Sequence, residues 1–404
     1  MTPAILAQRA FLRATVMNFF FFTSLNGFVL LPLYIARLGG TEIEIGLVMA
    51  GYSALGIFCQ PLVGPWVDVV GRRPFLLLGV TLLVVSAVVA ALSGGIAGLA
   101  LARALQGVAF SVFFVANFSH VLDLVPPAQR GWALGIYGVS GLLSSAVAPL
   151  IGEWTIRRAG FRPLFVGCAA VAGVAGVLAW STAEQRRDPG QPVRGSEWMR
   201  AGLEDLLRRP MAVTVFFGLG TGVVFAFLPT FAESLGVGVL SLFYTAYAGA
   251  AMAVRILGGR LIDTRGRRAV IVPSMFLQAL AVAGLGALGL SADAGVRAVP
   301  VLPVLVLVGL VAGGAHGFLY PGLAALVTDE APAARRGAVV GVFSAVFLAG
   351  NAGGAFAFGH VAHAGGYGVM WTALAALLLV GAALSLRLPD GASRPRPAAE
   401  RGLY

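Results

Sequence analysis

The sequence predicts an all-α membrane protein with about twelve transmembrane helices in two six-helix bundles. Of its 404 residues, 58% are hydrophobic and only 11% are charged, whereas soluble domains carry about 25% charged residues. The apolar residues form long blocks without the alternation of a membrane β-strand. Blocks of roughly 20 residues cross the hydrocarbon core as helices. These observations exclude a soluble globular domain and a β-barrel.

Twelve apolar blocks meet this length criterion. The first six cover about 11–36, 45–66, 75–93, 96–122, 131–152 and 163–183. The second six cover about 210–231, 239–258, 269–290, 299–326, 337–358 and 367–387. We therefore expect an N-terminal bundle over 1–183, a cytoplasmic linker over 184–209, a C-terminal bundle over 210–388 and a disordered tail over 389–404.

Arginine residues are distributed unevenly between the two sides of the predicted bundle. One side carries both termini, the linker and turns such as the one containing Arg72, and it holds most of the arginines. The other side holds few, among them Arg37 and Arg157. The positive-inside rule predicts that both termini are cytoplasmic. We expect a multi-pass protein of a bacterial-type cytoplasmic (inner) membrane.

The two halves of the chain repeat one another in sequence. The segment GPWVDVVGRR at 64–73 recurs as GRLIDTRGRR at 259–268, an offset of 195 residues. The segment PPAQRGWALG at 126–135 recurs as PAARRGAVVG at 332–341, an offset of 206 residues. Repeats in the same orientation predict two bundles related by an axis along the membrane normal.

The first repeat carries a recognisable motif in each half, Gly-x-x-x-Asp followed by Gly-Arg-Arg. Its residues are Gly64, Asp68, Gly71, Arg72 and Arg73, and again Gly259, Asp263, Gly266, Arg267 and Arg268. This pattern resembles the signature of the major facilitator superfamily, and the resemblance covers essentially the whole chain. It implies the major facilitator fold and a gating role for the motif. Val69 and Thr264 depart from the pattern, which has a basic residue after the aspartate.

Four further charged residues are candidate gate partners. The resemblance suggests that Asp68 faces the start of the eleventh span near Arg336, whose counterpart in the first half is Arg130. Asp123 and Asp329, at the ends of the fourth and tenth spans, are candidates to pair with the motif arginines. The alternative interpretation is that these charges only anchor short loops.

Two weaker patterns resemble the sugar and drug efflux permease (drug:proton antiporter) branch of the superfamily. The fourth span contains RALQGVAFS, in which Arg103 and Gln106 match an Arg-x-x-Gln-Gly pattern. The fifth span ends in a helix-bend segment with Pro149, Gly152 and Glu153. Polar residues inside spans are candidates for the substrate and proton cavity. These are Asn26, Arg103, Gln106 and His316. For His316, a core histidine and a titrating cavity group both stay open.

We expect secondary active transport by alternating access, with proton-coupled efflux of a small amphipathic organic compound. No carboxylate lies near the middle of a span, so coupling would use Glu153, His316 or the surroundings of Arg103. One alternative is a facilitator or importer of a sugar or organic acid. An alternative of a different class is a transporter-like membrane sensor.

The expected partners are a small organic solute, a proton as coupling ion and the lipid bilayer, with no nucleic acid, and the protein is expected to be a monomer. An enzyme is not expected, because no cluster of acids or histidines has catalytic spacing. No nucleotide-binding loop occurs, so ATP is not the expected energy source. No cofactor or metal site is expected, since His360 and His363 lack a carboxylate or cysteine companion.

Overall fold

The computed structural model describes residues 8–126, 129–183, 209–296, 300–329 and 336–389. The predicted tail except for its first residue, and the predicted linker except for its last residue, lie outside these residues. Several side chains inside helices also lie outside the description, among them those of Asp68, Arg130, Asp263 and Arg336. Every regular element in the described part of the chain is a helix, so the prediction of an all-α protein is confirmed.

The first half of the chain forms one bundle of long helices. Its elements are α1 (Arg9–Gly27), the 3-10 helix η1 (Phe28–Leu30), α2 (Leu31–Arg37), α3 (Glu42–Val70), α4 (Arg72–Leu92), α5 (Ile96–Leu124), α6 (Arg130–Ala159) and α7 (Phe161–Trp180). The first three follow one another directly and together form the first predicted span.

The second half of the chain forms the other bundle. Its elements are α9 (Arg209–Ser234), α10 (Ser241–Thr264), α11 (Arg267–Asp293), α12 (Val301–Asp329) and α13 (Arg336–Ser385). Helix α13 contains the last two predicted spans, which meet at a kink where Gly366 has φ 76°. By length and composition, 10 helices of the described chain are able to cross a membrane. Helix α10 is not among them and α13 counts once, which accounts for the difference from twelve.

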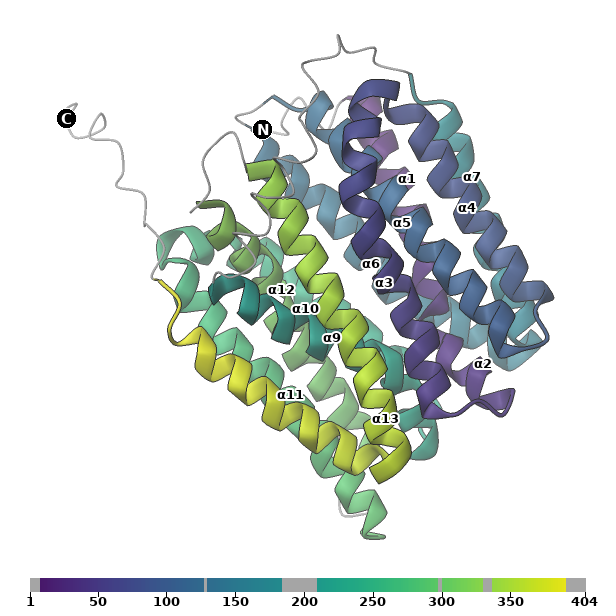
Figure 1. The fold of residues 1–404 in the computed structure, drawn as a ribbon, viewed down its shortest axis with the longest axis vertical. Coiled ribbons are helices and arrows are strands. Elements are labelled where there is room, and N and C mark those ends of the chain that lie inside the picture. The colour runs from purple at the N-terminus through teal and green to yellow at the C-terminus, as the bar shows by residue number, and fades with distance from the viewer. Residues whose placement is uncertain (1–7, 127–128, 184–208, 297–299, 330–335, 390–404) are drawn as a thin grey trace, which may run out of the picture.

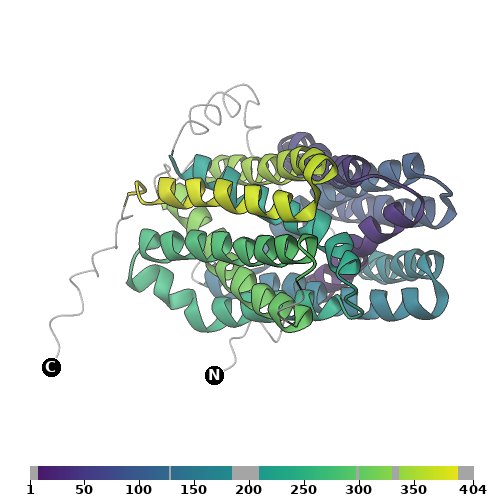
Figure 2. The ribbon, with the colours of Figure 1, turned by 90° about the horizontal axis from the view of Figure 1, so that it is seen from below.

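The two bundles lie side by side, the first in purple and blue and the second in teal, green and yellow (Figures 1 and 2). We call the side at which α1 begins and α13 ends the terminal face, and the opposite side the far face. Helix α3 runs from the far face to the terminal face, and the first part of α13 runs beside it in the opposite direction.

The turns on the terminal face are built by the repeated motif. Gly71 ends α3 with φ 108°, and Gly266 precedes α11 with φ 89°. A side chain is disfavoured at such positive φ values, so glycine is the residue that makes these sharp turns readily. Each glycine is followed directly by the two arginines that begin the next helix.

Among the described residues, the apolar core is continuous between the bundles only in the half nearer the far face. One cluster there joins Phe28 and Phe161 of the first bundle to Phe227 and Phe243 of the second. Toward the terminal face the described residues form separate clusters, such as the one around Phe343 in the second bundle and two in the first. The described parts of the bundles are therefore packed together at the far face and have separate apolar cores toward the terminal face.

Candidate functional site

Helices α3 and α13 form a seam between the bundles. A Cβ atom placed on Gly46 would lie 2.5 Å from the carbonyl oxygen of Ala355, so the two backbones touch near the far face. Farther along α3, Ser53 donates a hydrogen bond of 3.0 Å to the side-chain oxygen of Asn351. A Cβ atom on Gly56 would still lie 3.1 Å from the side chain of Leu348.

The seam opens toward the terminal face. Gly64 of the motif lies two turns beyond Gly56 on the same side of α3. A Cβ atom placed there would have no neighbour within 4 Å among the described residues. Among the described residues, no helix therefore packs against the motif glycine in this conformation.

Glu153, predicted as part of the helix bend, joins the bundles at the far face. Its carboxylate accepts hydrogen bonds from the backbone N–H groups of Leu240 (3.1 Å) and Ser241 (2.8 Å) at the start of α10. It also pairs with Arg157 one turn along α6, at 2.6 Å. A carboxylate at a helix N-terminus neutralises free N–H groups and the positive end of the helix dipole. Glu153 thus caps a helix of the opposite bundle.

The other two predicted bend residues lie in the same stretch of α6. Pro149 is inside the helix. A Cβ atom on Gly152 would lie 3.0 Å from the side chain of Leu30, so glycine allows α6 to approach η1. Two further pairs cross between the bundles on the far face, Arg37 with Glu233 at 3.8 Å and His363 with Glu42 at 3.2 Å.

The motif arginines of the first bundle, at the start of α4, bind the ends of three other helices. The Nε of Arg72 lies 3.3 Å from the carboxylate of Asp123, and its Nη1 donates to the carbonyl of Val67 at 2.6 Å. The guanidinium of Arg73 stacks 5.0 Å from the ring centre of Trp180 at the end of α7. Arg72 is buried, and its contacts with Asp123 and Val67 tie the ends of α3, α4 and α5 together.

The second bundle repeats this geometry. The Nε of Arg267 lies 3.1 Å from the carboxylate of Asp329, and its Nη1 donates to the carbonyl of Ile262 at 2.9 Å. Arg268 donates to the carbonyl of Leu386 at 2.7 Å. The structure therefore brings Asp123 and Asp329 to equivalent motif arginines. The side chains of Asp68, Asp263, Arg130 and Arg336, and the surroundings of Gly259, lie outside the described residues.

Arg103 lies inside the first bundle, and 7% of its surface is exposed. Its Nη1 donates to the side-chain oxygen of Gln106 at 2.7 Å, and the guanidinium lies 4.7 Å from the ring centre of Tyr52. Helices α3 and α5 approach closely beside it, where a Cβ on Gly107 would collide with the Tyr52 carbonyl. The Nε atom of Arg103 and the Nε2 atom of Gln106 have no hydrogen-bond partner among the described residues.

Asn26 bonds within the first bundle. Its side-chain nitrogen donates to the hydroxyl groups of Ser144 at 2.9 Å and Ser145 at 3.0 Å, which joins α1 to α6. Asn18 makes a similar bond to Ser140, two turns away. The structure therefore places Asn26 apart from the pair formed by Arg103 and Gln106.

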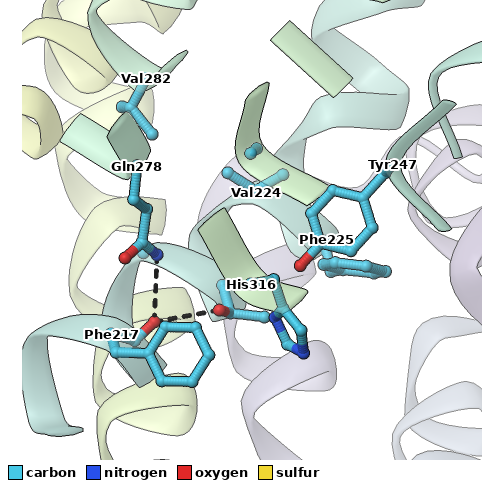
Figure 3. A pocket seen from close by; sticks show the side chains of 10 residues that line it. Phe217, Val224, Phe225, Tyr247, Gln278, Val282 and His316 are labelled. Atoms are coloured by element: carbon cyan, nitrogen blue, oxygen red, sulfur yellow. Dashed lines mark hydrogen bonds between the residues drawn. The ribbon is translucent and has the colours of Figure 1, made fainter. Parts of the chain in front are cut away.

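His316 lies in the second bundle at a small pocket (Figure 3). The pocket is lined by Phe217, Gly220, Thr221, Val224, Phe225, Tyr247, Gln278, Val282, Ala312 and His316. The space open to the centre of a water molecule is about 20 Å³, slightly more than one water needs. The rings of Phe217 and Tyr247 lie 5.1 and 5.6 Å from the imidazole, whose Nδ1 has no described partner.

An arginine, Arg255 on α10, lies beside this pocket. Its guanidinium is within electrostatic range of the hydroxyl groups of Tyr247 and Tyr320 and of the His316 ring. Its Nη1 is 3.2 Å from the position that a Cβ on Gly138 would occupy, so the side chain reaches α6 of the first bundle. It makes no hydrogen bond or ion pair with any described residue.

Comparison with known proteins identifies the family. The sequence pattern of the Major Facilitator Superfamily matches residues 13–304. The chain belongs to this superfamily. It is 23% identical over 403 residues to the staphylopine export protein of Staphylococcus aureus (strain Mu50 / ATCC 700699), which covers 96% of this chain and 97% of that protein.

Other members of the superfamily agree with this assignment. The inner membrane transport protein YajR of Escherichia coli (strain K12) is 29% identical over 206 residues, covering 48% of this chain and 43% of that protein. The crystal structure of a mutant of the nucleoside transporter NupG matches with a TM-score of 0.79 at 15% identity, over 94% of this chain and 100% of that chain. The predicted major facilitator fold is confirmed, and the protein is a multi-pass membrane transporter.

Within this major facilitator fold, sequence analysis missed Arg255 as a site residue. The signal was present in the sequence, because an arginine inside a predicted span is rare and most often faces a cavity or a partner. Its position near the end of the span also suited a side chain that reaches the membrane surface, and only the structure separates these possibilities. The contact of Glu153 with α10 was also missed, because it depends on how the two bundles pack against each other.

Proposed function

We propose that this major facilitator exports a small amphipathic organic compound in exchange for protons, by alternating access. The observation that carries the proposal is the seam between α3 and α13, which is closed at Gly46 and, among the described residues, open at Gly64. A transporter that alternates between two faces needs one conformation of this kind and another with the seam reversed. Export by the staphylopine export protein, which is similar over nearly the whole chain, supports the direction.

The terminal face is, in this proposal, the cytoplasmic face of the inner membrane. It carries the motif arginines such as Arg72 and Arg267, whereas the far face carries few arginines. The positive-inside rule favours that orientation. The conformation described above is then open to the cytoplasm and ready to accept a solute for export.

The helix register supports a gating role for the motif aspartates. Along the seam between α3 and α13, Ser53 contacts Asn351 and Gly56 contacts Leu348. A step of three residues forward on α3 therefore corresponds to a step of three residues back on the antiparallel α13. Continued to the terminal face, this register sets Asp68 opposite Arg336. We propose that closure of the terminal face brings the two together.

The seam between α6 and α10 supports the symmetric contact. Thr245 bonds to the carbonyl of Ala146 at 3.3 Å, and Arg255 reaches Gly138 ten residues farther along α10. Eight residues beyond this contact, toward the terminal face, α10 reaches Asp263 and α6 reaches Arg130. We propose that closure also brings Asp263 to Arg130, so that each seam would carry one aspartate–arginine pair at its terminal-face end.

For proton coupling we propose Glu153 as the group that links protonation to the far-face gate. Its charged form accepts two backbone N–H groups of α10 and pairs with Arg157. Protonation removes the negative charge that faces the helix N-terminus, so it weakens closure of the far face. His316 is the second candidate, because its Nδ1 has no described partner inside the second bundle. Arg103 and Gln106 are proposed to line the cavity from the first bundle.

The test is transport into and out of proteoliposomes that contain the purified protein. Ethidium, 2-naphthoate and glucose serve as a cation, an anion and a neutral sugar, each measured with and without an imposed pH gradient. Proton-coupled export predicts that at least one amphipathic probe moves against its gradient when the pH gradient is applied. Movement of glucose alone, unaffected by pH, would favour the facilitator alternative.

A further inference from the structure

Arg255 is a cation for which the described part of the protein provides no counter-charge. No carboxylate oxygen of a described residue lies within 4 Å of it, and its Nε is buried without a hydrogen-bond partner. An arginine inside a membrane span is unfavourable unless it is paired or hydrated. A mere structural role would be expected to give the guanidinium a protein partner.

The position of Arg255 argues against a side chain that simply extends to the membrane surface. It stands nine residues before the end of α10 at Thr264, about 14 Å at 1.5 Å per residue. The guanidinium instead points sideways toward Gly138 on α6, in the seam between the two bundles. Because residue 138 is glycine, no side chain at that position fills the space beside the cation.

Arg103 and Arg255 differ in their availability to a solute. Arg103 is buried, bonds to Gln106 and stacks on Tyr52. Arg255 is partly exposed and has neither contact. An incoming anion would have to displace existing contacts at Arg103, whereas at Arg255 it would supply the missing ones.

The surroundings of Arg255 suit an anion with an aromatic body. Tyr247 and Tyr320 place hydroxyl groups within electrostatic range of the guanidinium, and both are flanked by aromatic rings. The imidazole of His316 is stacked on the Tyr320 ring at 6.3 Å between centres, with 12° between planes. Flat aromatic surfaces next to a guanidinium fork bind a carboxylate or sulfonate together with an attached ring.

We propose that Arg255 binds the anionic group of the transported solute, and that the solute class is a small aromatic carboxylate or sulfonate. The guanidinium would donate hydrogen bonds to the anion while Tyr247, Tyr320 and His316 contact the ring. The adjoining pocket has room for a single bridging water. This inference rests on the proposed transport function and names its substrate class.

The test measures equilibrium binding to the purified full-length protein in detergent. The probes are 2-naphthoate and the neutral 2-naphthalenemethanol, which have the same ring and nearly the same size. The variants are Arg255→Gln, which removes the charge, and Arg255→Lys, which keeps the charge but loses the planar fork. Arg162→Gln is the matched control, because Arg162 is an exposed arginine at the start of α7.

The expected result is that the wild type binds 2-naphthoate more tightly than the alcohol. Arg255→Gln should weaken naphthoate binding about tenfold or more and leave alcohol binding unchanged. Arg255→Lys should lie between, and Arg162→Gln should change neither. If Arg255→Gln does not fold, the wild-type preference and Arg255→Lys still decide.

Three results would overturn the inference: equal affinity of the wild type for both probes, naphthoate affinity unchanged by Arg255→Gln, or an equal loss in Arg162→Gln. Because binding at equilibrium requires no flux, it can succeed where pH-driven export fails. Anion binding without export would contradict the proposed function alone. Export of a probe without any preference for the anion would contradict this inference alone.

Discussion

Alanine substitutions at Gly46 and Gly64 should shift the transporter in opposite directions. In Gly46→Ala the new methyl group would lie 2.5 Å from the Ala355 carbonyl oxygen and 3.3 Å from the Cα of Gly359. These are backbone atoms of a packed helix, so the seam must widen by roughly 1 Å to reach ordinary contact. Such overpacking costs about 1–3 kcal/mol, which is roughly a 5- to 150-fold shift of the conformational equilibrium.

Gly64→Ala adds the same methyl group at a position where no atom of a described residue lies within 4 Å. It leaves the present conformation unstrained. The continued register sets Gly64 opposite Val340, so the methyl group would obstruct closure of the terminal face. We expect this variant to populate the present conformation more strongly, while Gly46→Ala populates the conformation open at the far face.

Electron–electron distance measurements report the equilibrium directly. Spin labels at Val69→Cys and Arg265→Cys, both exposed near the terminal face, measure its opening. Cys59 and Cys168 are replaced by alanine beforehand. Relative to this background, Gly46→Ala should shorten the mean distance between the labels. Gly64→Ala should lengthen that mean distance or narrow the distribution of distances. The same direction of change in both variants would refute the assignment of the seam as the alternating gate.

Three further substitutions test individual contacts. Glu153→Gln keeps the shape of the side chain but loses the charge that faces α10. It should therefore weaken far-face closure by about 1 kcal/mol and flatten the pH dependence of transport in proteoliposomes, whereas an unchanged pH dependence would exclude Glu153 from coupling. Arg103→Lys loses the planar fork that contacts Gln106 and Tyr52, so it should impair probe transport nearly as much as Arg103→Ala; normal transport by the alanine variant at every pH would make the residue structural. Arg72→Gln leaves Asp123 without a contact that ties three helices together, so thermal unfolding in detergent should reveal a loss on the order of 2 kcal/mol; an unchanged melting temperature would contradict this.

Most of the fold was predictable because helices of membrane length are specified by local composition. The exception is α13, where the sequence predicts a loop between 358 and 367 and the structure has helix up to Gly366. The segment before this glycine contains no proline, and its glycines at 359 and 365 have helical backbone angles, so the helix continues through it. The break is placed by one glycine with φ 76°.

The candidate site was predictable where a contact follows from one helix or from the repeat. Gln106 stands three residues after Arg103, and residues at this spacing are neighbours on a helix. The partnership of Arg103 with Tyr52 depends instead on how closely α3 and α5 pack, which no local pattern reveals. The capping of α10 by Glu153 likewise depends on the distance between two bundles.

The two halves keep the same scaffold beneath the candidate site. Gly107 lets α5 approach the carbonyl of Tyr52, and Gly313 lets α12 approach the carbonyl of Tyr247 in the same way. Tyr247 follows Tyr52 at the offset of 195, and Gly313 follows Gly107 at the offset of 206. These offsets are those of the two repeated segments, the gating motif at 195 and the segment with Arg130 and Arg336 at 206, so gate and scaffold belong to the same repeat.

The polar residues on this scaffold are where the halves differ. At the same offsets, Arg103 corresponds to Gly309 and His316 to Phe110, while Arg255 corresponds to Gln60. The first half therefore has Arg103, which is held within its own bundle, and the second half has Arg255, which is directed at the seam. A symmetric pair of gates needs equivalent residues, but a solute that is itself asymmetric needs different groups on its two sides. Differences at these polar positions, beside conserved gate and scaffold glycines, are the pattern expected when the repeat serves motion and the differences serve recognition.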